Sequence, residues 1–137
     1  MAEWVYYNPN PRGRRTGDCV IRAICAATGQ DWETVYTGVA LAGMAMGDMP
    51  SSNHVWRAYL KSLGFRRREA PDTCPDCYTA GDFADEHPNG VYILSTGSHA
   101  VASVFGKLYD TWDSRGESIE SYFYKEGDPY AKLYADV

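Results

Sequence analysis

Apolar residues recur at helical spacing through the first half of the chain, between positions 20 and 64. A repeat of three to four residues places them on one face of a helix, and glycines and capping residues mark where helices should begin or end. The pattern predicts three helices. The first covers 20–28 and ends before Gly29, and the second runs from the N-cap residue Asp31 through 39. The third follows Ser51 or Ser52 and ends at Gly64. The preceding segment, 1–17, is rich in proline and glycine and is expected to be an ordered loop.

The second half of the chain has the shorter period of β-strands. β-Branched and aromatic residues cluster in four short runs separated by turns, at Val91–Thr96, His99–Phe105, Leu108–Trp112 and Ile119–Tyr124. A short helix is expected over Thr79–Glu86, after a loop at Pro71–Cys77. Helices followed by strands predict an α+β fold in which N-terminal helices pack on a C-terminal antiparallel β-sheet. The length predicts a single domain over 1–137.

Charge and composition narrow the possible functions. The net charge is −5, which disfavours binding to nucleic acid because such binding requires a positive field. No apolar run approaches the ~18 residues of a membrane span, and the N-terminus lacks the basic and apolar regions of a signal peptide. We therefore expect a cytoplasmic protein without membrane contact, whose four cysteines are thiols rather than disulfides.

Cys19 stands at the first turn of the first predicted helix. The unpaired N–H groups and the positive dipole end of a helix N-terminus favour a thiolate over a thiol. The same N–H groups could stabilise the oxyanion that forms when a sulfur attacks a carbonyl. Cys19 is therefore a candidate nucleophile, although a cysteine near a helix start more commonly serves as a small apolar residue.

His99 and Asp110 supply the partners that such a nucleophile needs. His99 begins one predicted strand, Asp110 lies on the next, and a hairpin turning at Gly106 would bring the two side by side. The carboxylate can then bind one imidazole nitrogen and leave the other to take the thiol proton. The pattern predicts a catalytic triad of Cys19, His99 and Asp110. Asp113 is an alternative to Asp110 as the acid that orients the histidine.

Three segments resemble the motifs of papain-like cysteine peptidases. Gly-Asp-Cys-Val-Ile-Arg-Ala-Ile at 17–24 is similar to their nucleophile helix, and His-Ala-Val-Ala at 99–102 to their histidine strand. Asp-Thr-Trp at 110–112 resembles their Asn-Ser-Trp element, with aspartate replacing asparagine as in bacteriocin-leader peptidases. The chain also resembles small papain-like proteins of bacteria and phages. The resemblance implies a papain-like fold and a thiol hydrolase that cleaves a peptide or isopeptide bond without a cofactor or metal.

The chain departs from that family at two points. Papain-like enzymes usually place a glutamine six residues before the cysteine to help form the oxyanion hole, and this position is Gly13 here. Asn8 or Asn10 could supply the missing donor. The spacing from Cys19 to His99 is also shorter than the ~130–150 residues of papain. The large substrate-binding insertions, which would indicate the kind of substrate, are therefore missing.

Other functions remain open for the same residues. The triad could catalyse acyl transfer or glutamine deamidation instead of hydrolysis. The fold could also serve a non-catalytic phage or bacterial protein that binds a host factor, since a fold does not determine a function. In each case the expected partner is a peptide or protein.

Two further clusters allow more than one interpretation. Cys74 and Cys77 form a Cys-x-x-Cys pair, for which we favour two incidental thiols in a surface loop over a zinc site or a redox pair. A second cluster lies shortly before the candidate nucleophile and consists of Arg12, Arg14 and Arg15. These arginines are either part of a solvated loop or a positive patch that favours the thiolate or attracts an acidic substrate.

Overall fold

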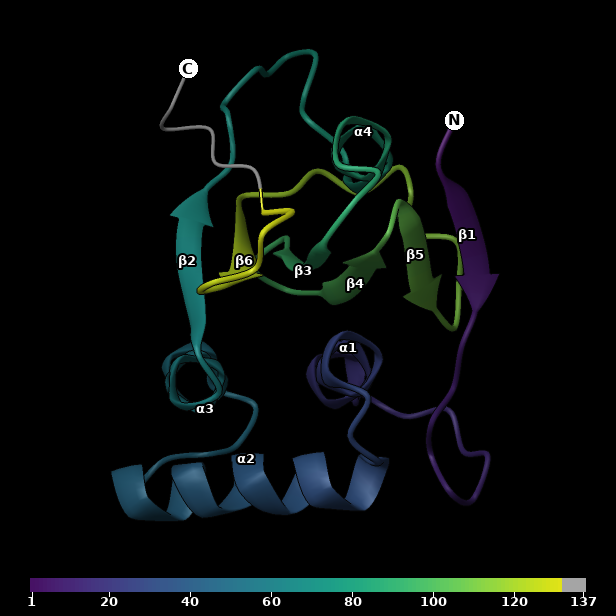
Figure 1. The fold of residues 1–137 in the computed structure, drawn as a ribbon. Coiled ribbons are helices and arrows are strands. Elements are labelled where there is room, and N and C mark those ends of the chain that lie inside the picture. The colour runs from purple at the N-terminus through teal and green to yellow at the C-terminus, as the bar shows by residue number, and fades with distance from the viewer. Residues whose placement is uncertain (132–137) are drawn as a thin grey trace.

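The computed structural model describes residues 1–131, which form a six-stranded β-sheet with helices on both faces (Figure 1). The strands lie in the order β1-β5-β4-β3-β6-β2, with bounds Glu3–Tyr6 (β1), Phe65–Glu69 (β2), Val91–Ser95 (β3), Ala100–Val104 (β4), Lys107–Asp110 (β5) and Ser121–Lys125 (β6). The four described helices are Cys19–Thr28 (α1), Trp32–Met46 (α2), Asn53–Ser62 (α3) and Ala80–Glu86 (α4). Residues 132–137 of the expected domain lie outside the described part.

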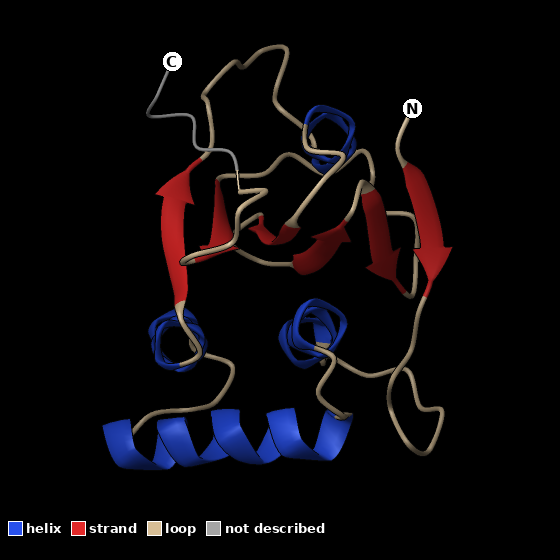
Figure 2. Cartoon of the chain, in the orientation of Figure 1, coloured by secondary structure: helices blue, strands red, loops and turns tan. Residues whose placement is uncertain are grey.

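The helices are divided unequally between the two faces of the sheet. α1 and α3 lie against one face with α2 beneath them, whereas α4 covers the opposite face (Figures 1 and 2). The α+β fold is therefore confirmed, and all four predicted strands are present within two residues of their expected ends. None of the helices within 1–131 is both long and apolar enough to cross a membrane.

The sheet is mixed rather than antiparallel, because β1 pairs in parallel with β5. The expectation of a loop over 1–17 was therefore wrong for its first residues. Trp4, Val5 and Tyr6 are good strand formers, and the prolines and glycines of the segment begin only after them. The open edge of β5 supplies the backbone partners that make this strand, and the Trp4 indole donates a further hydrogen bond to the Asp110 carbonyl at 3.1 Å.

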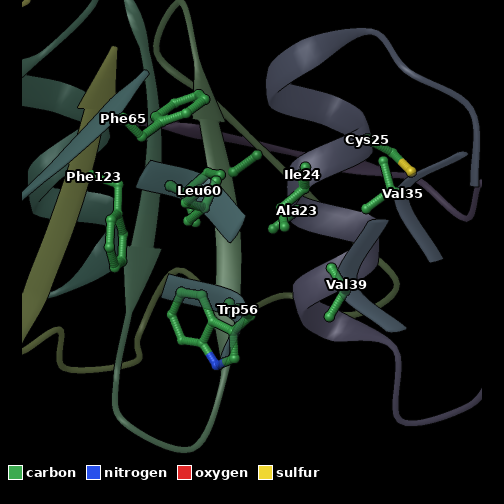
Figure 3. Close-up of a cluster of buried hydrophobic side chains, with 12 residues drawn as sticks. Ala23, Ile24, Cys25, Val35, Val39, Trp56, Leu60, Phe65 and Phe123 are labelled. Atoms are coloured by element: carbon green, nitrogen blue, oxygen red, sulfur yellow. The ribbon is translucent and has the colours of Figure 1, made fainter. Parts of the chain in front are cut away.

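The apolar core that positions the site lies between α1 and the sheet. Ala23 and Ile24 of α1 pack with Ala100 and Ala102 of β4 in one buried cluster. Small side chains on β4 allow the helix to lie close to the strand, because protein interiors are filled without gaps. Figure 3 shows this cluster continuing to Leu60 of α3. The close contact brings the start of α1 near the start of β4.

Gly43 allows the chain to leave α2 close to the helix itself. The helix ends at Gly47, whose φ of +68° is left-handed, and the N–H of Asp48 donates to the Gly43 carbonyl at 2.9 Å. A Cβ atom on Gly43 would lie 2.7 Å from the Asp48 carbonyl oxygen and 3.2 Å from the Pro50 nitrogen. The missing side chain therefore makes room for segment 48–50 to fold back against α2.

We expect Gly43→Ala to lower the free energy of unfolding by about 1–3 kcal/mol, because the added methyl group meets backbone atoms that cannot move aside cheaply. At an open helical position the same change stabilises by about 1 kcal/mol. Thr37→Ala, at an exposed position of α2, is the control and should leave stability unchanged or slightly raised. Urea unfolding followed by circular dichroism measures both variants, and a stabilised Gly43→Ala protein would contradict the close approach.

Candidate active site

Cys19 is the first residue of α1, and no side chain caps the N-terminus of this helix. Asp18 precedes it and belongs to a residue type that commonly caps helices. Its carboxylate instead binds the Arg22 guanidinium (Oδ1 to Nη1, 2.7 Å) and the Trp32 indole (Oδ2 to Nε1, 2.9 Å). The first N–H groups of a helix have no acceptor within the helix. They therefore remain available beside Cys19.

The β4–β5 hairpin brings His99 and Asp110 together, as the sequence predicted. The turn residues Phe105 and Gly106 both have positive φ, 48° and 78°, which matches the twist of a tight hairpin. Nε2 of His99 lies 2.7 Å from Oδ2 of Asp110. The other ring nitrogen remains for Cys19, which lies close enough to the imidazole for each group to shift the pKa of the other. The three predicted triad residues thus form one connected group.

Asp110 is fully buried, and each of its oxygens has two partners. Oδ2 binds His99 and accepts a hydrogen bond from the Ser114 hydroxyl at 2.7 Å. Oδ1 accepts from the backbone N–H of Thr111 at 2.8 Å and from the Arg22 guanidinium at 2.9 Å. A carboxylate held on all sides cannot rotate away, so the orientation of the imidazole is determined by the surrounding fold.

Arg22 is a buried residue that sequence reasoning missed. Its guanidinium lies between Asp18 at the start of α1 and Asp110 at the end of β5, and the residue is 4% exposed. Asp18 and Arg22 stand four positions apart, which places them on one helical face. In the sequence, only this four-residue spacing beside Cys19 indicates that Asp18 and Arg22 form an ion pair. It does not indicate that Arg22 also binds Asp110.

The charges of the site favour a thiolate. Burial alone would raise the pKa of Cys19, but hydrogen bonds from His99 and from the backbone N–H of Ala100, together with the positive charges of His99 and Arg22, lower this pKa below its usual value. A cationic neighbour that donates a hydrogen bond stabilises the charged form of sulfur.

The pKa values of His99 and Asp110 are shifted in opposite directions, each toward the charged form of the group. Burial would lower the pKa of His99, but its hydrogen bonds to Asp110 and Cys19 raise that pKa to about 9. Burial would raise the pKa of Asp110, and the hydrogen bonds from His99 and Ser114 outweigh this and lower it. At neutral pH the imidazole is therefore cationic and the carboxylate anionic, and both favour an ion pair between His99 and the Cys19 sulfur.

A cleft of about 400 Å³ opens beside Cys19 and His99. Its walls are the start of α1, the segment that joins α2 to α3, and the β3–β4 turn. Most of its lining is apolar and comes from Val20, Ile21, Val39, Pro50 and Trp56. Trp112, two residues after Asp110, packs against the His99 ring, with the ring centroids 4.9 Å apart. The cleft is large enough to receive a side chain together with its flanking backbone.

Asn8 and Asn10, the possible oxyanion donors, are hydrogen-bonded within their own loop. Within the described residues, neither lines the cleft at Cys19. The Asn8 amide donates to the carbonyl of Arg14 at 3.3 Å, and the Asn10 side-chain oxygen accepts from the N–H of Arg12 at 2.9 Å. Asparagine side chains commonly bond the backbone two residues ahead, and this local geometry decides their role. The uncapped N–H groups at the start of α1 are donors that lie beside the sulfur.

Asp113, the alternative acid, lies outside the triad. Its carboxylate binds the Arg115 guanidinium at 2.7 Å, and its side chain is 40% exposed. The structure therefore places Asp110, and not Asp113, against His99.

Cys74 and Cys77 form a disulfide, with their Cα atoms 4.0 Å apart. This contradicts the expectation of two incidental thiols in the 71–77 loop. The expectation of thiols rested on the rarity of disulfides in proteins that are not exported. The turn in this loop brings the two cysteines of the Cys-x-x-Cys segment close enough in space to form the bond. Among the described residues, the free thiols are Cys19 and the buried Cys25.

The fold and the site thus define an α+β protein in which a thiol, an imidazole and a carboxylate meet at the edge of an apolar cleft. The thiol stands on a helix, the imidazole directly before β4, and the carboxylate at the end of β5. No family model, curated protein or solved structure matches this chain, so what the site can do follows from its own geometry and chemistry.

Replacing Arg22 should destabilise the protein strongly. Arg22→Met keeps much of the side-chain volume but leaves Asp18 and Asp110 buried without their cation, so we expect the free energy of unfolding to fall by roughly 3–5 kcal/mol. Arg115→Met removes an exposed ion pair of the same length and should cost less than about 1 kcal/mol. Urea unfolding of both variants checks the difference, and equal losses would contradict the importance of the buried pairs.

The reactivity of the cysteines should divide into three classes. Under non-reducing conditions at about pH 6, iodoacetamide should modify Cys19 alone, at least about tenfold faster than a free cysteine with its pKa of ~8.5. Cys25 should react only after unfolding, since it is 1% exposed and burial raises its pKa to about 11. Cys74 and Cys77 should react only after reduction. Mass spectrometry counts the labels, and His99→Ala should slow the labelling of Cys19. Equal labelling rates for all four cysteines would contradict an activated Cys19.

Proposed function

We propose that this protein is a papain-like thiol hydrolase that cleaves a peptide or isopeptide bond through Cys19, His99 and Asp110. One observation carries the proposal. A single imidazole is hydrogen-bonded to a buried carboxylate and shares one cleft with a thiol that stands at an uncapped helix N-terminus. A protein that only bound a partner would gain nothing from this arrangement, because buried polar groups cost free energy unless every partner is in place.

The papain-like class is supported by where the three groups stand. The nucleophile begins a helix that packs on the sheet, the histidine directly precedes β4, and the acid ends β5. The segments around them are those that resemble papain-like motifs, at 17–24, 99–102 and 110–112. Local sequence and three-dimensional placement therefore agree on the same residues.

The first half of the proposed reaction forms an acyl-enzyme. The Cys19 sulfur attacks the carbonyl carbon of the scissile amide, and the carbonyl oxygen becomes an oxyanion. The N–H groups at the start of α1 are the donors available to stabilise that charge. The C–N bond then breaks, and the leaving amine takes the proton carried by His99. The product of this half-reaction is a thioester on Cys19.

The second half releases the acid product. Water attacks the thioester carbon, His99 accepts a proton from the water, and the C–S bond breaks to restore the Cys19 thiolate. Asp110 does not react. It keeps the ring in the orientation that serves both steps and stabilises the imidazolium, and its saturated hydrogen bonds suit that role.

Cleavage of a diverse peptide library, read by mass spectrometry, tests the proposal. Cys19→Ala should abolish cleavage, and His99→Ala should reduce it by at least about 10²-fold. Cys25→Ala is the matched control and should retain activity, because this thiol is buried in the core. If the wild-type protein cleaves no peptide although its Cys19 is rapidly alkylated, the hydrolase proposal is wrong.

The rate of hydrolysis should depend on pH as a bell-shaped curve. The acid limb follows formation of the Cys19 thiolate and should lie below the ~8.5 of an ordinary thiol, because the pKa of Cys19 is lowered. The alkaline limb follows loss of the imidazolium proton that the leaving amine needs, with a pKa near 9. Asp110→Asn removes the carboxylate that raises the pKa of His99, so this limb should move to lower pH. Asp113→Asn should leave kcat/KM unchanged at every pH, and a shifted alkaline limb in that variant would transfer the orienting role to Asp113.

A further inference from the structure

A second depression adjoins the Cys19 cleft. It has a volume of about 380 Å³ and shares Gly17, Asp18 and Ile21 with the cleft, so the two hollows are neighbours on one surface. Gly17 has no side chain, and the space that its Cβ would occupy is open. An extended chain that lies over Gly17 can therefore enter both hollows without meeting a barrier.

One face of α2 lines both hollows. Trp32 and Tyr36 border the second depression and Val39 borders the cleft, at the i, i+4, i+7 spacing of a single helical stripe. The rings of Trp32 and Tyr36 stack with their centroids 5.0 Å apart, and Tyr36 is 51% exposed. Tyr36 and the half-buried Trp32 offer apolar surface at the second depression, whereas Val39 is 1% exposed and adds little surface at the cleft.

Arg12 and Arg14 line the second depression as well. Among the described residues, neither makes an ion pair with a carboxylate, whereas several other arginines do, namely Arg22, Arg57, Arg66, Arg67 and Arg115. The chain as a whole carries a net charge of −5. Two cations without an ion-pair partner at one hollow therefore make a locally positive surface on a negatively charged protein. Asp18, which also borders the hollow, is 6% exposed and its carboxylate is already paired with the buried Arg22.

The loop that carries the two arginines is ordered by its own hydrogen bonds. Asn8 and Asn10 bind the backbone of Arg14 and Arg12 respectively, and a turn is closed by the N–H of Gly13 donating to the Asn10 carbonyl at 2.9 Å. Arg15 anchors the loop to the sheet by donating to the Thr111 carbonyl at 2.7 Å. Little backbone entropy remains to be lost when a ligand binds the two free guanidinium groups.

Resting on the hydrolase function proposed above, we propose that the second depression is a specificity subsite that selects substrates with an aspartate or glutamate a few residues from the scissile bond. Arg12 and Arg14 bind the carboxylate, and the rings of Trp32 and Tyr36 contact the apolar part of the same segment. Guanidinium groups bind carboxylates through paired, charge-assisted hydrogen bonds. The arginines also offset the repulsion that an acidic substrate meets at a protein of net negative charge.

The test compares cleavage by the wild-type protein and by an Arg12→Glu/Arg14→Glu variant on one library with equal numbers of acidic and basic peptides. We expect wild-type cleavage sites to be enriched in aspartate or glutamate at one or two positions. On the best peptide and its Glu→Lys counterpart, the double variant should lose roughly tenfold in kcat/KM for the acidic peptide and prefer the basic one. Raised salt should weaken both preferences.

Two controls separate a local effect from changes in charge or folding. Lys61→Glu/Arg68→Glu alters the net charge equally at positions that line neither hollow, and it should keep the acidic preference. Arg12→Gln/Arg14→Gln removes the cations without reversing them and should abolish the preference without creating a basic one. The rate of Cys19 alkylation by iodoacetamide should be unchanged in all three variants, which shows that the triad is intact.

The outcomes are distinguishable. Cleavage without an acidic preference, or a preference that survives in Arg12→Glu/Arg14→Glu, overturns the subsite and leaves the hydrolase function standing. A wild-type protein that cleaves no peptide overturns both.

Discussion

The burial of Arg22 between two carboxylates is the interaction on which the rest of the site depends. One guanidinium binds Asp18, beside Cys19, and Asp110, which is hydrogen-bonded to His99. It therefore ties the helix that carries the thiol to the strand that carries the acid. Three charges removed from water must remain paired, because leaving one unpaired costs several kcal/mol. The position of α1 on the sheet is thus held by electrostatics as well as by the packing of Ala23 and Ile24 on β4.

This pairing also determines the chemistry at the start of α1. Because the Asp18 carboxylate is committed to Arg22 and Trp32, it does not cap the helix, and the first N–H groups stay free beside Cys19. Positive and negative groups then alternate from Arg22 through Asp110 and His99 to the sulfur. Each partner shifts the pKa of the next toward its charged form, and the result is a thiol that is more acidic than burial alone would allow.

Sequence reasoning succeeded where neighbours along the chain decide the structure. The four later strands, the contact between His99 and Asp110, and the helices follow from short periodic patterns and one tight turn, except that α2 continues to Met46 beyond its predicted end at 39. It failed for β1, which depends on the open edge of β5, and for Asn8 and Asn10, whose side chains bind their own loop. It also failed for the Cys74–Cys77 disulfide, because general preferences for thiols carry no information on how one loop folds.

By itself, the sequence determined which residues could do chemistry: a cysteine at a helix start and a histidine and an aspartate on neighbouring strands. Only the tertiary structure decided how these groups are held, because the deciding contacts join distant segments. Arg22 and Asp110 are 88 residues apart, and no local pattern couples them. The meeting of Arg12 and Arg14 with Trp32 and Tyr36 of α2 likewise exists only after the chain has folded. Periodicity reports which face of an element is buried, whereas partners across the core are chosen by packing and charge in three dimensions.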